Sequence, residues 1–219
     1  MFPLLDREKE NPFDLFQIWL NLPAKKKMVE PRFTMLWSSS IPEKEILDEQ
    51  GRKIVITVRA GEVLGAKAPE PPVDSWAHDA NNEVGIWTAT LEPEAVFFLP
   101  AASPTIHRNI YVVAGKSLTV GGTLLRVHQG AELRPDQTLQ IKNGEEPAEI
   151  LILQGRPIGE PIARRGPFVM NTEAEIQKAY ADFRETRFGG WPWSSSSPIH
   201  GNNPDRFARR ADGKIERPG

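Results

Sequence analysis

The sequence predicts an all-β fold, a sandwich or barrel of antiparallel strands in a jelly roll, followed by one C-terminal helix. Short apolar and β-branched runs recur at close intervals between positions 53 and 153. Glycine, proline, asparagine or aspartate occupies nearly every gap, and no helical period appears before residue 173. Short, closely spaced strands with turn residues between them are typical of such folds. The predicted strands are residues 53–59, 84–91, 95–99, 109–113, 117–120, 123–127, 138–142 and 150–153.

Residues 1–40 are predicted to form the end of a linker and then an N-terminal strand arm. Every second residue from position 16 to position 22 is apolar. Side chains alternate between the two faces of a strand, so this pattern predicts a strand with at least one buried face. A second short strand is expected at residues 29–36. The alternating apolar residues are Phe16, Ile18, Leu20 and Leu22.

Residues 41–168 are predicted to be the sandwich domain. The longest interruption between its strands, residues 65–82, is rich in proline and is expected to wrap the surface as an irregular loop. Gly121 and Gly122 separate two short strands and predict a hairpin turn, not a phosphate-binding loop. The apolar run at residues 150–153 predicts a strand that is buried on both faces.

Residues 169–190 are predicted to contain a capping helix, over about residues 173–187. Thr172 and Glu175 have the spacing of a capping box, in which each side chain satisfies a backbone N–H of the first turn. Apolar residues then recur at helical spacing and give the helix one apolar face. The connector before it is rich in glycine and proline and is expected to lack regular structure. The apolar face consists of Ile176, Ala179, Tyr180 and Phe183.

Residues 191–219 are predicted to form an irregular tail. Gly189 and Gly190 end the regular structure, and a run of serines and an arginine-rich end follow. Trp191 and Trp193 are expected to pin this tail to the domain through their large apolar rings.

Composition restricts the classes of function. The formal net charge of −2 provides no overall basic field, so the sequence argues against nucleic-acid binding. The absence of cysteine excludes disulfides and cysteine-ligated zinc or iron–sulfur sites. The longest apolar stretch near the start is broken by Gln17 and Asn21, so it fits neither a signal peptide nor a membrane span. We therefore expect a soluble, cytoplasmic protein.

Several motifs resemble the pirin family of the cupin superfamily. The resemblance is strongest where GRPIGEPI, from Gly155, is followed by GPFVMNT, from Gly166. It covers roughly residues 12–190 and corresponds in order and spacing to the second half of a bacterial pirin-like protein. The resemblance implies a cupin-type jelly roll for this chain. The other matching segments are LFQIWLNLP at 15–23, KMVEP at 27–31, AGEVLG at 60–65 and IYVVAG at 110–115.

The resemblance also provides a test for a metal site. A cupin site uses two histidines and a glutamate from one motif and a third histidine from a later strand, donors that suit a divalent first-row metal. Threaded onto this chain, the histidine pair falls within residues 100–104, the glutamate on Arg108 and the third histidine on Gln140. None of these positions holds a histidine, cysteine or carboxylate. The resemblance therefore implies no metal or other cofactor in this chain, with iron only in an N-terminal half.

The threaded positions leave one candidate ligand site. His107, Arg108 and Gln140 are candidates for binding an anion or another ligand at the mouth of the barrel. Arg108 would either bind such an anion or hold the polar interior of the barrel together. No residue is predicted to be catalytic. The four histidines lack the spacing of joint metal ligands; they are His78, His107, His128 and His200.

Two hypotheses about function remain open. In the first, the chain is a metal-free C-terminal cupin domain that serves as scaffold and docking half for an iron-binding N-terminal half. The chain alone would then be inactive, and the whole protein would resemble quercetin 2,3-dioxygenases. In the second, it is a stand-alone small-ligand or protein-interaction module, such as a pirin of the transcription-cofactor type. The expected partner is the N-terminal half or a second copy, bound through uncovered apolar faces of the strand arm and the helix.

Overall fold

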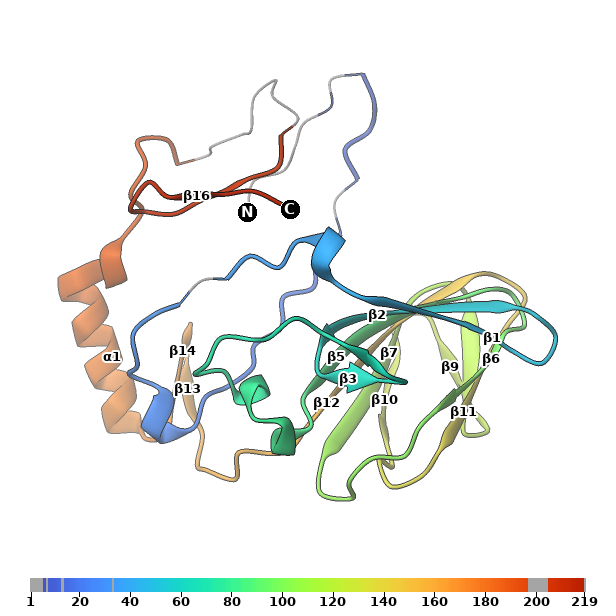
Figure 1. Ribbon diagram of the computed structural model, residues 1–219. Helices are drawn as coiled ribbons and strands as arrows, with labels where there is room; N and C mark the ends of the chain where they lie inside the picture. Colours follow the sequence, from blue (N-terminus) through green and yellow to red (C-terminus); the bar gives the residue numbers. More distant parts are fainter. Residues whose placement is uncertain (1–5, 7, 13, 33, 197–204, 219) are drawn as a thin grey trace. The chain divides into compact units, whose positions relative to one another are not determined.

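Two compact units make up the chain (Figure 1). The computed structural model describes residues 6, 8–12, 14–32, 34–196 and 205–218. One unit, residues 29–159, holds the β-sandwich. The other combines residues 1–28 with residues 160–219 and holds the helix.

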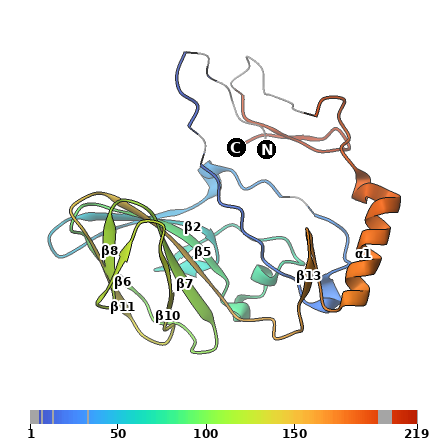
Figure 2. The same cartoon turned by 180° about the vertical axis from the view of Figure 1, so that it is seen from behind.

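The sandwich unit consists of two antiparallel sheets (Figure 2). Six strands form one sheet in the order β1-β2-β5-β12-β7-β10, and four form the other in the order β6-β11-β8-β9. Strands far apart in sequence are neighbours, as a jelly roll requires. The first sheet comprises β1 (Glu43–Leu47), β2 (Lys53–Ala60), β5 (Gly85–Leu91), β12 (Ala148–Gly155), β7 (His107–Ala114) and β10 (Gly130–Leu133). The second comprises β6 (Val96–Leu99), β11 (Leu139–Asn143), β8 (Ser117–Val120) and β9 (Thr123–Arg126).

The hydrophobic core draws on alternate residues of both sheets. In β2, Ile54, Ile56 and Val58 are at most 1% exposed, whereas the residues between them are half-buried. Strand β12 lies between β5 and β7, and its successive residues Leu151 and Ile152 are both buried. This confirms the prediction of a strand buried on both faces.

The eight predicted strands are all present, with bounds that differ by no more than two residues at either end. Gly121 and Gly122 form the turn between β8 and β9 with φ of 54° and 84°, values that suit a two-residue hairpin. Strands β1 and β10 were not predicted from the sequence. Both are edge strands of the six-stranded sheet and are largely exposed, so neither carries a clear apolar alternation.

The predicted N-terminal strand is wrong. Residues 14–23 form neither helix nor strand, and no described segment pairs with them. Phe16, Ile18 and Leu20 are 37–39% exposed, so the alternation here does not mark a buried face. The second short strand, expected at 29–36, is also missing from residues 29–32 and 34–36, and residue 33 lies outside the described residues. A strand needs a hydrogen-bonded neighbour, which a local pattern cannot reveal.

The helix of the second unit, α1 (Glu173–Thr186), begins and ends as the sequence predicts. The backbone N–H of Glu175 donates to Thr172 Oγ1 at 3.3 Å, and that of Thr172 donates to Glu175 Oε2 at 2.7 Å. The capping box is thereby confirmed. Arg187 closes the helix in the left-handed region with φ of 53°. Among the described residues no helix has the length and apolar character needed to cross a membrane.

The connector before α1 contains a hairpin, so the expectation that it lacks regular structure is wrong. Strand β13 (Ala163–Arg165) pairs with β14 (Phe168–Met170). Gly166 turns the chain with φ of 55°, and a Cβ at this position would lie 2.6 Å from the hydroxyl of Tyr180. The same hydroxyl donates to the carbonyl of Arg165 at 3.1 Å. Glycine at the turn therefore permits the close approach of hairpin and helix.

The apolar face of α1 is covered within its own unit. Ile176 is fully buried. The ring of Phe168 meets those of Tyr180 and Phe183 edge-on, with centroids 4.7 and 6.0 Å apart. Strand β14 thus covers the apolar face of α1, which was expected to be partly uncovered.

The tail is not wholly irregular, which corrects a further expectation. Strands β15 (Ala208–Arg209) and β16 (Ile215–Glu216) pair in it, and residues 197–204 lie outside the described residues. The rings of Trp191 and Trp193 contact each other edge-on, with centroids 4.6 Å apart. That these rings pin the tail to the domain remains a prediction.

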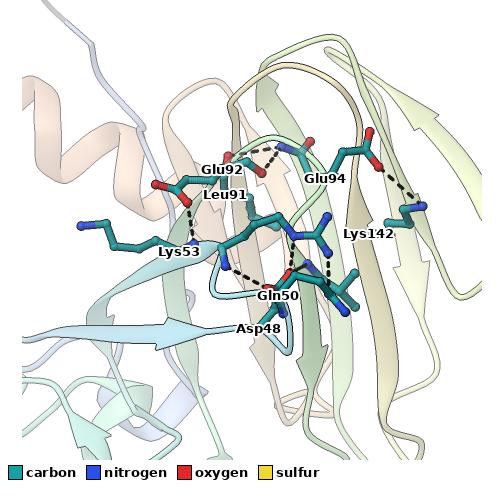
Figure 3. Close-up of polar contacts among 10 residues, drawn as sticks. Asp48, Gln50, Lys53, Leu91, Glu92, Glu94 and Lys142 are labelled. Carbon is teal, nitrogen blue, oxygen red and sulfur yellow. Dashed lines mark hydrogen bonds and ion pairs between the residues drawn. The ribbon is translucent and has the colours of Figure 1, made fainter.

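A buried carboxylate joins the turn between β1 and β2 to the start of β6. Asp48 accepts hydrogen bonds of 2.7–3.0 Å from the backbone N–H groups of Gln50, Arg52 and Val96 and from Arg52 Nε (Figure 3). The Asp48 side chain is only 3% exposed. Burial opposes ionisation, but these hydrogen bonds outweigh it and lower the pKa of Asp48 from 3.8 to about 2.

A buried amide closes the same end of the sandwich. Asn143 Nδ2 donates to the carbonyls of Leu91 and Glu92 at 3.2 and 2.9 Å (Figure 3). It also donates to the carbonyl of Glu146 at 2.8 Å, and its Oδ1 accepts from the N–H of Gly144 at 2.8 Å. The residue is 2% exposed. One side chain therefore ties the end of β11 to the end of β5 and to the loop before β12.

Asn143→Ala is expected to lower the free energy of unfolding by about 1–3 kcal/mol, because it leaves buried carbonyls without a donor. Urea unfolding at neutral pH measures the change. The exposed Gln137→Ala is the matched control and is expected to change stability little. Equal stability of the two variants would contradict this role for Asn143.

Asp48→Asn is expected to lower stability at pH 7, and its difference from wild type should shrink as the pH falls. A lowered folded-state pKa stabilises the fold above the unfolded pKa, and this contribution disappears as the pH falls through the folded pKa of about 2. The variant lacks this titration, whereas the other carboxylates titrate in both proteins. Urea unfolding at pH 7, 5, 4, 3 and 2 measures the difference. A difference that does not vary with pH would contradict the assignment.

Candidate functional site

A cavity of about 730 Å³ lies within the sandwich unit. Its lining includes both residues of β3 (Glu62–Val63), the short strand labelled in Figure 1. The long interruption of the sequence forms one side of it. That segment was expected to be irregular, but it contains β4 (Ala66–Lys67), which pairs with β3, and two short 3-10 turns, Trp76–His78 and Ala80–Asn82. The lining comes from parts of residues 61–71, 77–84 and 99–102 and from Trp87, Arg108 and Gln154.

Arg108 places a charged group in the lining of this cavity. It alternates along β7 with the buried residues Ile110 and Val112, so it occupies a core-facing position and is only 2% exposed. Its Nε donates to Gln154 Oε1 at 2.8 Å and its Nη1 to the carbonyl of Pro100 at 2.7 Å. Burial lowers the pKa of the Arg108 guanidinium, and the nearby charge of Glu83 opposes that shift. Arginine nevertheless stays charged in proteins.

Gln154 fixes the orientation of Arg108. The antiparallel register of β12 and β7 places these two residues directly opposite each other. Gln154 Nε2 donates to the carbonyl of Glu83 at 3.0 Å, so its oxygen is the atom left to accept from Arg108. Glu83 adopts a left-handed conformation with φ of 47°. One amide therefore connects the buried arginine to a turn far away in sequence.

The carboxylate of Glu83 is engaged with other partners. Its Oε1 lies 3.6 Å from Arg156 Nη2, and its Oε2 accepts from the N–H of Ser103 at 3.2 Å. No described carboxylate oxygen lies within ion-pair distance of Arg108. Glu83 therefore acts on Arg108 through space and not through a direct ion pair.

The segment of residues 76–83 is attached to the end of β12 by polar contacts. Trp76 Nε1 donates to the carbonyl of Arg156 at 2.8 Å, and the N–H of Arg156 donates to the carbonyl of Asn82 at 2.7 Å. Asn82 Nδ2 in turn donates to the carbonyl of Trp76 at 2.8 Å. This closed set of hydrogen bonds holds one wall of the cavity in place.

The structure does not bring the three predicted ligand residues together. Only Arg108 lines the cavity. His107 points to the opposite face of β7, is 66% exposed at its side chain and lies 3.6 Å from Glu132. Gln140 is exposed on β11, in the other sheet, because the buried position of that strand is Ile141.

The sequence analysis missed Gln154 and Glu83. A polar residue directly after the buried run of β12 is a weak signal for Gln154. Nothing in the sequence marks Glu83, because its position depends on a left-handed turn.

The donor set around Arg108 does not fit a divalent metal. A guanidinium brings positive charge to the position where the threading places a cation, and it cannot serve as a ligand. Within the described ranges, no three histidine, aspartate or glutamate side chains gather as metal ligands. His78, at the edge of the cavity, pairs with one acid, Glu70, at 3.8 Å. We therefore assign no chemistry in this chain to a metal.

The jelly roll of two antiparallel sheets defines the class of this protein as a cupin. Residues 86–189 match the pirin C-terminal cupin domain. The chain therefore contains the C-terminal cupin domain of the pirin family.

Known proteins resemble the chain over part of their length. A pirin-like protein of Solanum lycopersicum is 31% identical over 171 residues, which cover 77% of this chain and 54% of that protein. Pirin-1 of Arabidopsis thaliana is 29% identical over 186 residues, covering 79% of this chain and 57% of Pirin-1. A crystal structure of quercetin 2,3-dioxygenase from Acinetobacter baumannii superimposes with a TM-score of 0.65 at 30% identity, covering 77% of this chain and 55% of that one. The chain thus spans little more than half the length of these relatives.

Gln154→Ala is expected to destabilise the fold by about 1–3 kcal/mol, because it removes an acceptor from the buried Arg108 and a donor from the carbonyl of Glu83. Gln140→Ala, at an exposed strand position, is the matched control and should have a much smaller effect. Thermal and urea unfolding measure both. A cost at Gln140 as large as that at Gln154 would contradict the assignment.

Proposed function

We propose that this chain is the metal-free cupin half of a pirin-type protein and serves as scaffold for an iron-binding cupin half that docks onto it. Residues 41–168 are the cupin domain in this proposal, and residues 1–40 form the passage between the halves. The whole protein would act in the cytoplasm as a dioxygenase of the quercetin 2,3-dioxygenase type. The similarity to such an enzyme of Acinetobacter baumannii and the partial coverage of longer relatives support this view.

The observation that carries the proposal is the exposed apolar segment of residues 15–20. Leu15 and Trp19 are 58% and 61% exposed, and Phe16, Ile18 and Leu20 are each more than a third exposed. Side chains of this size seldom stand together in solvent unless they meet a partner. The segment lacks regular structure, so its side chains can adapt to the surface that covers them.

The partner in this proposal is a cupin half and not a peptide or a membrane. This chain matches 54% and 57% of these relatives, and the remainder of each is large enough for a second domain. Burial of apolar surface stabilises by about 25 cal/mol per Å², so cover for the several exposed side chains of this segment would contribute several kcal/mol.

Docking is tested by mixing the chain with the part of Pirin-1 that lies outside the matched 57%. Calorimetry and size-exclusion chromatography with light scattering are expected to detect a complex. The double variant Leu15→Ser/Trp19→Ser should bind at least about tenfold more weakly, which corresponds to about 1.4 kcal/mol. Leu124→Ser is the matched control, because Leu124 is 56% exposed but lies on the sandwich.

Two results would contradict docking. One is a monomeric chain that neither binds the Pirin-1 part nor takes up a dye for exposed apolar surface. The other is equal weakening by the double variant and by Leu124→Ser.

The untagged chain is expected to contain well below one metal ion per molecule after incubation with iron(II), nickel(II), copper(II) or zinc(II) and removal of free ions. The reason is the donor set at the threaded positions, where Arg108 and Gln140 replace acidic and histidine ligands. Elemental analysis measures the content. One metal ion per chain would contradict the expectation.

A second function is favoured by a separate observation. The cavity at Arg108 lies wholly within the sandwich unit, so a small-ligand module would not require a second half.

A further inference from the structure

We propose that the cavity at Arg108 binds a small monocarboxylate with an apolar, preferably aromatic, body. The carboxylate would accept hydrogen bonds from the Nη1 and Nη2 end of the guanidinium, and the body would fill the apolar part of the cavity. This site differs from the metal site expected in a second half, and it does not depend on docking.

Arg108 has more hydrogen-bond donors than the described chain satisfies. A guanidinium has five N–H donors. Nε donates to Gln154 and one Nη1 hydrogen to the carbonyl of Pro100, and no acceptor in the described parts of the chain takes a hydrogen bond from Nη2. Arg108 is one of the residues that line the cavity, so a ligand bound there can reach the donors that the described chain leaves unpaired. A carboxylate matches two neighbouring N–H groups with two oxygens.

The charge of Arg108 has no direct counterion among the described residues. A buried cation is stabilised by a paired anion, and no acid of the described chain forms an ion pair with Arg108. Glu83 is already engaged by Arg156 and by the N–H of Ser103. A bound carboxylate would supply the missing countercharge without displacing an existing ion pair.

Part of the cavity wall is apolar. Trp87, Leu99 and Val84 line the cavity and are at most 5% exposed. Trp87 Nε1 already donates to the carbonyl of Ala60 at 3.0 Å, so the indole has only apolar surface left to offer. Volumes of about 300–1,000 Å³ are typical of small-molecule sites. The cavity therefore suits a body of one or two rings.

The edge of the cavity selects against larger anions. Glu62, Glu70 and Asp79 contribute negative charge there, against the positive charge of Lys67. A polyanion such as a phosphate would meet this acidic edge and would find one buried cation only. A single carboxylate carries one negative charge, which is enough to pair with Arg108. The acidic residues at the edge repel it less than they repel a polyanion.

The test uses 2-naphthoate, its neutral amide 2-naphthamide and inorganic phosphate as probes of the full chain. Calorimetry and thermal unfolding are expected to show saturable binding of 2-naphthoate and a raised Tm. The amide should bind at least about tenfold more weakly because it lacks the charge, and phosphate should not raise the Tm. Equal binding of acid and amide, or no binding of the acid at all, would overturn the proposal.

Two variants locate the site. Arg108→Met keeps an unbranched apolar stem in the core but removes the charge, and it should abolish the preference for acid over amide. Ala101→Trp keeps Arg108 and fills the cavity from an exposed lining position, and it should abolish binding of both probes. Arg134→Met, at a residue 71% exposed at its side chain, is the matched control and should bind like wild type.

The second variant keeps the test decisive if Arg108→Met does not fold. Undiminished binding of 2-naphthoate to Ala101→Trp would place the probe elsewhere and overturn the proposal. Failure of the Pirin-1 mixing experiment would leave this test unaffected, because the cavity is contained in the sandwich unit.

Discussion

The burial of one permanent positive charge sets the geometry of the candidate site. The guanidinium of Arg108 cannot shed its proton, so its burial is favourable only where acceptors meet its N–H donors. Strand β12 provides Gln154 through its register, and the chain after β6 provides the carbonyl of Pro100. These contacts fix the separation of three elements around a long polar side chain. The space left between them is the cavity, which apolar packing alone would tend to close.

The two ends of the sandwich satisfy their buried polar groups in different ways. At one end, Asp48 and Asn143 find all their partners within the protein, and the end is closed. At the other end, Arg108 has more donors than the surrounding chain has acceptors, and the end is hollow. Polar groups thus rigidify one end of the fold and leave the other able to accept a ligand.

Most of the fold could be predicted, because the buried residues of core strands are apolar and recur at regular positions in the sequence. Edge strands β1 and β10 and hairpin β13–β14 were missed because backbone pairing, not side-chain burial, defines them. The alternating apolar residues at positions 16–22 led to a wrong prediction. This segment has the sequence pattern of a strand but no neighbouring strand in the described chain to pair with. Arg108 could be found from its threaded position, whereas Gln154 could not, because its role depends on strand register. Gln140, chosen by spacing alone, lies on the exposed face of another sheet.

The wall segment of residues 76–83 has a thermodynamic consequence. It is attached to β12 by hydrogen bonds, and of its residues only Asn82 is buried. Heat-capacity changes follow the apolar surface that becomes hydrated. The largest apolar side chain of this segment is the half-buried Trp76, so release of the segment would hydrate far less apolar surface than global unfolding of the core. The enthalpy of that local release would therefore vary less with temperature than the enthalpy of global unfolding.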